Sequence, residues 1–182
     1  EKKNYRTRCS ALIKSNSKNI LIDTSPDLRT QLIKNNITNI DNVIFSHNHA
    51  DQIHGINDLR IFSYKNKKRI TAYADKETEK YLKKNFSYCF NDTLSYKAIL
   101  KLNKIKKNCT LSEKDNLILI KSTPVQHVKI ISKSLIINRS CAYAREINKN
   151  KNKFFKFFKK LNYFIVARLK INKHPSHFNL SD

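Results

Sequence analysis

The feature that most constrains this chain is a cluster of histidines in residues 46–55. His47, His49 and Asp51 are spaced two positions apart, and His54 follows, so three of the six histidines fall within eight residues. Alternating side chains point to one side where a chain leaves a strand, so the first three groups converge. Neutral imidazole and carboxylate groups both bind divalent metals. A chance cluster in a polar loop is the alternative, but the density of histidines favours a metal site.

The segment around the histidines resembles the end of a strand. Asn42–Ser46 is a short apolar run that leads directly into the histidine loop. Functional loops are often carried at the ends of such rigid elements. Gly55, the only glycine of the chain, lies in the same loop. We expect it to adopt a backbone conformation that other residues avoid.

Strands and helices alternate along the rest of the chain. Short apolar runs predict further strands at Cys9–Lys14, Asn19–Asp23, Ile70–Ala74, Leu117–Ser122, Leu135–Asn138, Cys141–Ala144 and Tyr163–Val166. Ser25 followed by Pro26 predicts a helix with Ser25 as its N-cap, and Asp75 is expected to cap a second helix. Three apolar residues would form the buried face of the first helix: Leu28, Leu32 and Ile33.

This pattern predicts an α/β protein in which helices cover a pair of central sheets. Hydrophobic residues make up 40% of the 182, which is typical of a globular chain. There is no internal repeat and no linker rich in proline or glycine. We therefore expect residues 1–182 to form a single domain.

The formal net charge of +23 has two explanations. One is a polyanionic partner such as nucleic acid or a phosphate-bearing substrate. The other is codon composition, because Lys, Asn and Ile are all abundant and the lysines are spread along the whole chain. The lysine-rich segment Phe154–Phe158 has the same ambiguity. Its aromatic rings suit the buried face of an amphipathic helix better than a platform for stacking bases.

Several classes of protein are disfavoured. No apolar run approaches the roughly 18 residues needed to span a bilayer, and the polar start does not resemble a signal peptide. The chain contains no methionine, so we expect residue 1 not to be the start of the gene product. The cysteines form no Cys-x-x-Cys pair and are expected to be reduced thiols of a cytoplasmic protein: Cys9, Cys89, Cys109 and Cys141.

Residues 46–60 resemble the His-x-His-x-Asp-His signature of the metallo-β-lactamase superfamily. The continuation Gly55–Arg60 is similar to the branch that contains the phosphonate-pathway cyclic phosphodiesterase and relatives of tRNase Z. Other segments match this branch in the same order: Arg8–Ile13, Asn19–Asp27, Thr123–His127, Cys141–Ala144 and His174–Leu180. The resemblance therefore covers nearly the whole chain.

The resemblance implies an αββα four-layer sandwich with two divalent ions, zinc or manganese, at one edge. The family binds its first ion through three histidines, which correspond here to His47, His49 and His127. Asp51 corresponds to a ligand of the second ion, and Glu146 lies near the carboxylate that bridges the two ions. The nucleophile of the family is a water held by the ions, so Asp51 is also assigned to catalysis.

His174 and His177 correspond to a helix start near the substrate in the family. The resemblance implies that both contact substrate and that His177 assists catalysis as a proton donor. A helix cap and a surface histidine are the alternative reading of the same two residues. The implied substrate is a small phosphodiester or RNA, no membrane is involved, and a homodimer remains open.

The chain departs from the family at the second metal site. Gln52 stands where the family has histidine, and a neutral amide is a weaker ligand than imidazole; His54 is a candidate substitute. Glu146 replaces the usual aspartate. Three more departures are Val128, Arg145 and Ala167. The first strand and the C-terminal strand and helix region, which carries the late metal histidine, are expected to lie outside this sequence, so the fold would be incomplete.

Three functions fit these observations. The first is a metal-dependent hydrolase of the phosphodiesterase type, with a good first metal site and weak turnover. The second is an inactive or decayed member of the family that binds metal or nucleic acid. The third is a basic nucleic-acid-binding protein with a structural metal. β-Lactam hydrolysis is not expected, because the segments that resemble the phosphodiesterase and tRNase Z branch point away from it and the fold alone does not determine the substrate.

Overall fold

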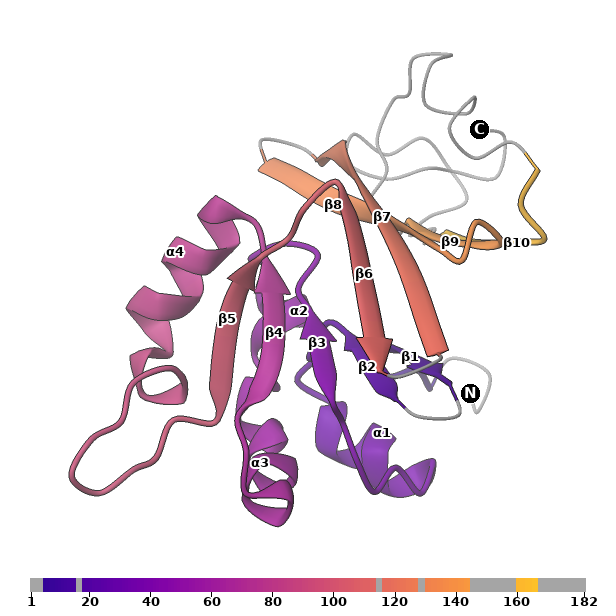
Figure 1. Ribbon diagram of the computed structural model, residues 1–182. Helices are drawn as coiled ribbons and strands as arrows, with labels where there is room; N and C mark the ends of the chain where they lie inside the picture. The colour runs from indigo at the N-terminus through magenta and orange to yellow at the C-terminus, as the bar shows by residue number, and fades with distance from the viewer. Residues whose placement is uncertain (1–4, 16–17, 114–115, 128–129, 145–159, 167–182) are drawn as a thin grey trace. The chain divides into compact units, whose positions relative to one another are not determined.

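The computed structural model describes residues 5–15, 18–113, 116–127, 130–144 and 160–166 (Figure 1). The chain divides into two compact units, Glu1–Ile105 and Lys106–Asp182. We call them the histidine unit and the strand unit. The expectation that residues 1–182 form one domain stays a prediction.

The histidine unit contains a five-stranded sheet with the strands in chain order. Its strands are β1 (Ala11–Lys14), β2 (Asn19–Ile22), β3 (Asn42–Ile44), β4 (Ile70–Ala74) and β5 (Leu100–Lys104). β1 and β2 form an antiparallel hairpin in which Ala11 pairs with Ile22, and every later pair is parallel. Each of the three parallel pairs requires a crossover connection, and every one of these connections contains a helix. The predicted strands of this half are confirmed.

Helices and 3₁₀ turns connect the strands of this sheet. They are α1 (Leu28–Lys34), α2 (Ala50–Ile53), η2 (Ile56–Leu59), α3 (Arg60–Asn66), α4 (Lys76–Asn85) and η3 (Ser87–Cys89). As predicted, Asp75 caps α4: its Oδ1 accepts a hydrogen bond of 2.9 Å from the backbone N–H of Thr78. Within the described residues, no helix is both long enough and apolar enough to cross a membrane.

The start of α1 differs from the prediction. Its N-cap is Asp27, not Ser25, so the helix begins at Leu28. The Ser25 hydroxyl lies 3.1 Å from Oε1 of Gln31, and the Ser25 carbonyl accepts from the N–H of Leu28. The expected apolar face was also wrong at Ile33, which is 67% exposed. Ile33 follows Leu32 directly, and a rotation of about 100° per residue carries it off the buried face.

One hydrophobic core joins the helices to the sheet. Leu21, Val43 and Ala72 lie opposite one another on β2, β3 and β4, so they point to the same face of the sheet and belong to one cluster. Helices contribute further members, among them Leu28, Leu32, Ile53, Leu59, Phe62 and Leu82. Burying an aliphatic or aromatic side chain of this size contributes roughly 1.5–3 kcal/mol. This core fixes the parallel sheet that carries the histidine loop.

Most of the described residues of the strand unit form a second five-stranded sheet. Its order is β10, β9, β8, β7, β6, with bounds β6 (Asn108–Glu113), β7 (Asn116–His127), β8 (Ile130–Ile137), β9 (Cys141–Ala144) and β10 (Tyr163–Val166). β6 to β9 are antiparallel, and β10 pairs in parallel with β9. The predicted strands of this half are confirmed. The predicted helix around Phe154–Phe158 lies outside the described residues.

Candidate metal centre

The histidine loop follows β3, which lies between β2 and β4 in the parallel part of the sheet. The carboxyl ends of parallel strands meet at one sheet edge, where ligands of α/β proteins usually bind. Backbone hydrogen bonds hold the loop from both sides: the N–H of Asp23 donates to Ile44 O, and the N–H of Phe45 donates to Tyr73 O. Phe45 is fully buried in the core. The first residues of the loop therefore rest on a rigid base.

Asp23 links the end of β2 to the histidine loop. Its Oδ1 accepts a hydrogen bond of 2.7 Å from the backbone N–H of Ser46, and its Oδ2 accepts one of 2.8 Å from the Ser46 hydroxyl. Asp23 is 0% exposed and has a φ of 60°. Aspartate and asparagine tolerate this left-handed conformation better than most residues. The backbone turn thus aims the carboxylate at Ser46.

Ser46 passes this orientation on to His47. The Ser46 Oγ lies 2.9 Å from Nδ1 of His47. A hydroxyl has one hydrogen, and here that hydrogen goes to Asp23. Ser46 Oγ must then accept from His47, so Nδ1 carries a hydrogen, and in the neutral imidazole Nε2 carries the lone pair. That is the tautomer in which Nε2 can bind a metal, and a fixed partner on the other nitrogen is typical of metal-binding histidines.

His47 and His49 lie next to each other, as the spacing predicts. Their ring centroids are 4.7 Å apart, with an angle of 71° between the planes. His47 is 1% exposed, whereas His49 is exposed. The pair thus combines a buried imidazole with one that faces solvent. Both remain predicted ligands of an ion.

Asp51 and Gln52 are in direct contact in α2. The side-chain amide of Gln52 donates a hydrogen bond of 2.7 Å to Oδ2 of Asp51. Gln52 is 0% exposed, and Asp51 is partly exposed. In this arrangement Gln52 orients the Asp51 carboxylate and engages one of its two oxygens. The residue that departs from the family signature therefore contacts a predicted ligand.

His54 is the C-cap residue of α2 and lies against an aromatic ring. The centroids of the His54 and Phe86 rings are 5.7 Å apart, with an angle of 70° between the planes. The His54 side chain is exposed. Its proposed role as a substitute for a histidine at position 52 stays a prediction.

A glycine is needed at position 55 because a side chain would clash with its neighbours, not because of its backbone conformation. Its φ is −86°, which any residue can adopt, so the expected reason for this glycine was wrong. A Cβ at this position would lie 2.0 Å from the Ser25 carbonyl oxygen and 2.9 Å from Cβ of Leu28. The N–H of Gly55 donates to Thr24 O, and the N–H of Thr24 donates to Gln52 O. The segments after β2 and after α2 therefore pack too closely for a side chain here.

The other predicted site residues are not brought together in the described part of the chain. His127 is the last residue of β7 in the strand unit, where it pairs with Ile130. Glu146, His174 and His177 lie outside the described residues. Within the described ranges, no three His, Cys, Asp or Glu side chains gather in a way that could hold an ion. The donor chemistry of His47, His49 and Asp51 nevertheless fits a divalent ion, because the Asp23–Ser46 pair fixes the ligating tautomer of His47.

Sequence reasoning missed Asp23 and Ser46 as functional residues. A signal was present, because both are polar residues that directly follow an apolar strand. Adjacent parallel strands bring their carboxyl ends together. The direction of the hydrogen bonds, however, depends on a contact between residues 23 positions apart.

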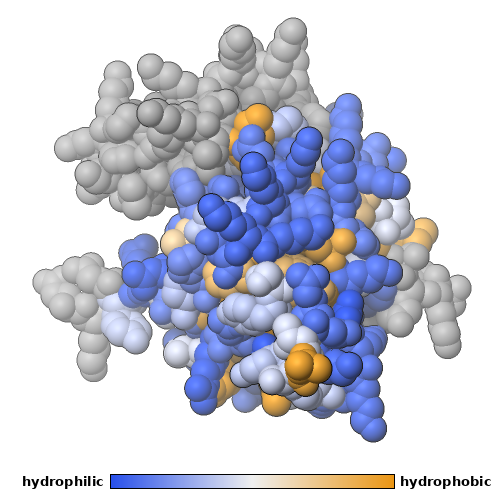
Figure 2. All heavy atoms as spheres, turned by 90° about the vertical axis from the view of Figure 1, so that its left-hand side faces the viewer, coloured by the Kyte–Doolittle hydropathy of each residue, from blue (hydrophilic) through white to orange (hydrophobic). Residues whose placement is uncertain are grey.

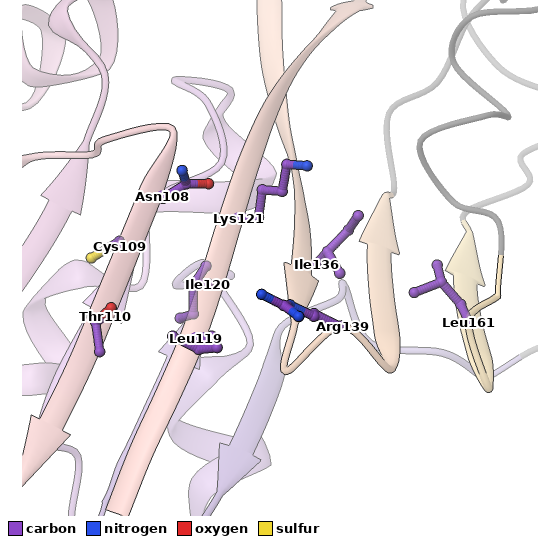
Figure 3. A pocket seen from close by; sticks show the side chains of 9 residues that line it. All are labelled: Asn108, Cys109, Thr110, Leu119, Ile120, Lys121, Ile136, Arg139 and Leu161. Carbon is purple, nitrogen blue, oxygen red and sulfur yellow. The ribbon is translucent and has the colours of Figure 1, made fainter.

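A hollow of about 480 Å³ lies in the strand unit (Figure 3). Its lining includes Cys109, Lys121, Arg139 and Leu161. Burial raises the pKa of the Cys109 thiol, against the opposing effect of Lys106. A protonated thiol is a poor nucleophile, and the described lining contains neither histidine nor carboxylate to activate it. This hollow therefore lacks hydrolytic chemistry of its own.

Solved structures similar to this chain share its fold. A new diphosphatase from the PhnP family superimposes with a TM-score of 0.83 at 26% identity, covering 97% of this chain and 66% of its own. Zn²⁺-bound PqqB from Methylobacterium extorquens has a TM-score of 0.73 at 14% identity, with 92% and 62% of the chains covered. The short form of human tRNase Z has a TM-score of 0.52 at 14% identity, with 76% and 62% covered. The α/β fold class expected from the sequence, with two sheets, is confirmed.

One curated relative and one family model match this sequence. An octanoyltransferase from Porphyromonas gingivalis is 35% identical over 86 residues, which are 47% of this chain but only 17% of that protein. This chain therefore spans less than a fifth of that curated relative. The Beta-lactamase superfamily domain matches residues 18–180, which include the histidine loop and every strand except β1. The chain therefore belongs to the family described as the Beta-lactamase superfamily domain.

Proposed function

We propose that this protein is a metal-dependent hydrolase that cleaves phosphodiesters. The observation that carries the proposal is the Asp23–Ser46–His47 chain of hydrogen bonds, which presents Nε2 of His47 in its ligating form next to His49. Membership of the family and the likeness to a diphosphatase at 26% identity support it.

His47, His49 and the predicted third histidine, His127, would hold the first ion. Asp51 would bind a second ion, with Glu146 as the predicted bridging carboxylate. A bound divalent ion lowers the pKa of a water molecule and neutralises charge on phosphoryl oxygens. The ions would be zinc or manganese, because imidazole and carboxylate ligands suit both.

The protein's own groups have separate tasks in this proposal. Asp23 and Ser46 hold the tautomer and ring orientation of His47. Gln52 holds the Asp51 carboxylate by its 2.7 Å hydrogen bond. His177 would donate a proton to the leaving alkoxide, and His174 would contact the phosphate of the substrate. The positive charge of the chain favours a phosphate-bearing substrate, either a small phosphodiester or RNA.

Metal analysis and a generic phosphodiester assay test the proposal together. The purified protein should retain about one transition metal per chain and hydrolyse bis(4-nitrophenyl) phosphate slowly. His47→Ala should lose both properties, whereas Asn48→Ala, a neighbour in the same loop, should keep both. A protein that retains no transition metal after purification in zinc or manganese would rule the proposal out.

The second candidate is a family member that binds metal without turnover. It is favoured by Gln52, which is buried and engages an oxygen of Asp51 where the family has a metal-binding histidine. Val128, Arg145, Glu146 and Ala167 add to this reading but lie outside the described residues. A metal-loaded protein without hydrolysis would support it, and robust hydrolysis would exclude it.

A further inference from the structure

A group of aromatic and basic side chains lies on α3, in the turn between α3 and β4, and in the loop that precedes β5. We call it the α3 patch. Its members are Arg60, Tyr64, Lys67, Lys68, Tyr96 and Lys97. Tyr64, Lys67, Lys68 and Lys97 line a hollow of about 370 Å³. Small-molecule sites typically occupy roughly 300–1,000 Å³, so this hollow can admit a base or a phosphate.

Arg60 holds the two tyrosine rings of the patch. Its guanidinium carbon lies 4.5 Å from the centroid of the Tyr96 ring and 6.0 Å from that of Tyr64. Both distances are within the range of cation–π contacts. The buried Nη1 of Arg60 has no hydrogen-bond partner among the described residues. Tyr64 is 58% exposed and Tyr96 is 50% exposed, so each ring also presents surface to solvent.

The loop that carries Tyr96 is ordered by its own hydrogen bonds. The N–H of Tyr96 donates to Oγ1 of Thr93 at 3.0 Å, and the N–H of Thr93 donates to Tyr96 O at 2.7 Å. Asp92 accepts from the N–H of Ala98 and from Arg69, each at 2.8 Å. The backbone hydrogen bond from Ala98 is the main reason why the pKa of Asp92 is lowered. Tyr96 is thus presented on a preorganised loop, which reduces the entropic cost of binding.

Lys67 and Lys68 follow the end of α3, and Lys97 lies in the loop before β5. Lys67 takes the left-handed C-cap position with a φ of 51°, and the Ser63 hydroxyl donates to Lys68 O at 2.9 Å. The carboxylate of Asp92 pairs with Arg69. Among the described residues, Lys67, Lys68 and Lys97 form no ion pair within 4.0 Å. Figure 2, which looks onto the side of α4, shows hydrophilic residues covering most of that face.

We infer that the α3 patch binds single-stranded RNA. Exposed tyrosine rings next to lysines are the combination that binds unpaired bases and their phosphates, because the rings stack on bases and the cations contact the backbone. A second copy of this chain is disfavoured as the occupant, because both copies would carry a net charge of +23. The inference does not depend on the metal centre, since no patch residue is a predicted ligand.

The test measures the affinity of the full chain for fluorescein-labelled (rU)12 by fluorescence anisotropy. Tyr64→Ala and Tyr96→Ala should each weaken binding by about fivefold or more, the effect of losing one stacked base. Tyr96→Phe keeps the ring and should bind like the wild type. Lys67→Ala combined with Lys68→Ala should reduce the slope of log K against log salt by about 0.7 for each RNA phosphate that these lysines neutralise.

Matched controls separate the patch from diffuse charge. Lys14→Ala with Lys34→Ala removes the same charge from exposed positions on β1 and α1 and should change binding less than the Lys67 and Lys68 pair. Tyr5→Ala removes an exposed ring outside the patch and should have no effect. All titrations are repeated in EDTA, where binding should persist even if the metal proposal fails. Equal affinity of wild type and both tyrosine-to-alanine variants, or equal binding of a 12-residue oligoglutamate, would overturn the inference.

Discussion

Asp23→Asn is the substitution that examines the candidate metal centre most directly. Asparagine has nearly the same shape and tolerates the φ of 60° found at this position. Its Oδ1 can still accept from the backbone N–H of Ser46, so the loop should keep its path. Only the second contact changes, because an NH₂ group would replace the oxygen that now accepts from the Ser46 hydroxyl.

The expected consequence is a reversed chain of hydrogen bonds. The asparagine NH₂ would donate to Ser46 Oγ, and the hydroxyl would then donate to Nδ1 of His47. The ring hydrogen of His47 would move to Nε2, the nitrogen that must carry a lone pair to bind an ion. Changing such a supporting group typically weakens metal affinity about 10- to 100-fold, which corresponds to about 1.4–2.8 kcal/mol.

Two measurements check this prediction. Competition with a chromogenic zinc chelator gives the affinity, and ¹⁵N chemical shifts of the imidazole nitrogens in the metal-free protein report the tautomer. Ser46→Ala is the matched control, since it removes the hydroxyl without imposing a donor and should weaken affinity less. An Asp23→Asn protein with wild-type zinc affinity and the hydrogen still on Nδ1 would refute the reasoning.

Three further predictions concern neighbouring features. Gly55→Ala should lower the free energy of unfolding by about 2 kcal/mol or more, because the new Cβ would overlap the Ser25 carbonyl. Urea unfolding measures this change, and an unchanged stability would contradict the packing argument. Gln52→His should raise bound metal from about one to about two ions per chain by plasma mass spectrometry, since it restores an imidazole ligand at the second site; an unchanged content would contradict it. Burial raises the pKa of the Cys89 thiol to about 11, whereas Cys9 is exposed. Iodoacetamide at pH 8 should therefore modify Cys9 well before Cys89, as measured by peptide mass spectrometry. Equal rates of modification would contradict this prediction.

The positions of the strands were predictable because they follow from the spacing of apolar residues and the length of each apolar run, which are local properties of the sequence. Ile70–Ala74 was predicted with the bounds that the structure has, and Asp75 caps the following helix as expected. The start of α1 was not predictable in the same way. Ser25 has the composition of an N-cap, but its hydroxyl lies against Gln31, one turn further along the chain. A side chain that can cap a helix can also bind elsewhere, and tertiary contacts decide between the two.

The histidine pair could be predicted, but its protonation could not. Spacing alone brings His47 next to His49, since alternate residues share a side. The tautomer of His47 depends on Asp23, which reaches Ser46 only after β2 and β3 have paired. Gly55 shows the same limit. Gly55 stands out in the sequence as the only glycine. A glycine can be needed for an unusual backbone conformation or for close packing of another segment, and only the structure shows that the Ser25 carbonyl packs against Gly55.

The two halves of the candidate centre should therefore respond differently to residue 52. The chain of hydrogen bonds to His47 runs through Asp23 and Ser46 and does not involve Gln52, so the proposed first metal site should not depend on that residue. The proposed second site lacks an imidazole ligand at position 52, and the Gln52 amide also engages an oxygen of Asp51 that an ion would use. Two ions would share the stabilisation of the attacking and leaving oxygens of a phosphodiester, so we expect a protein with only the first ion bound to turn over slowly.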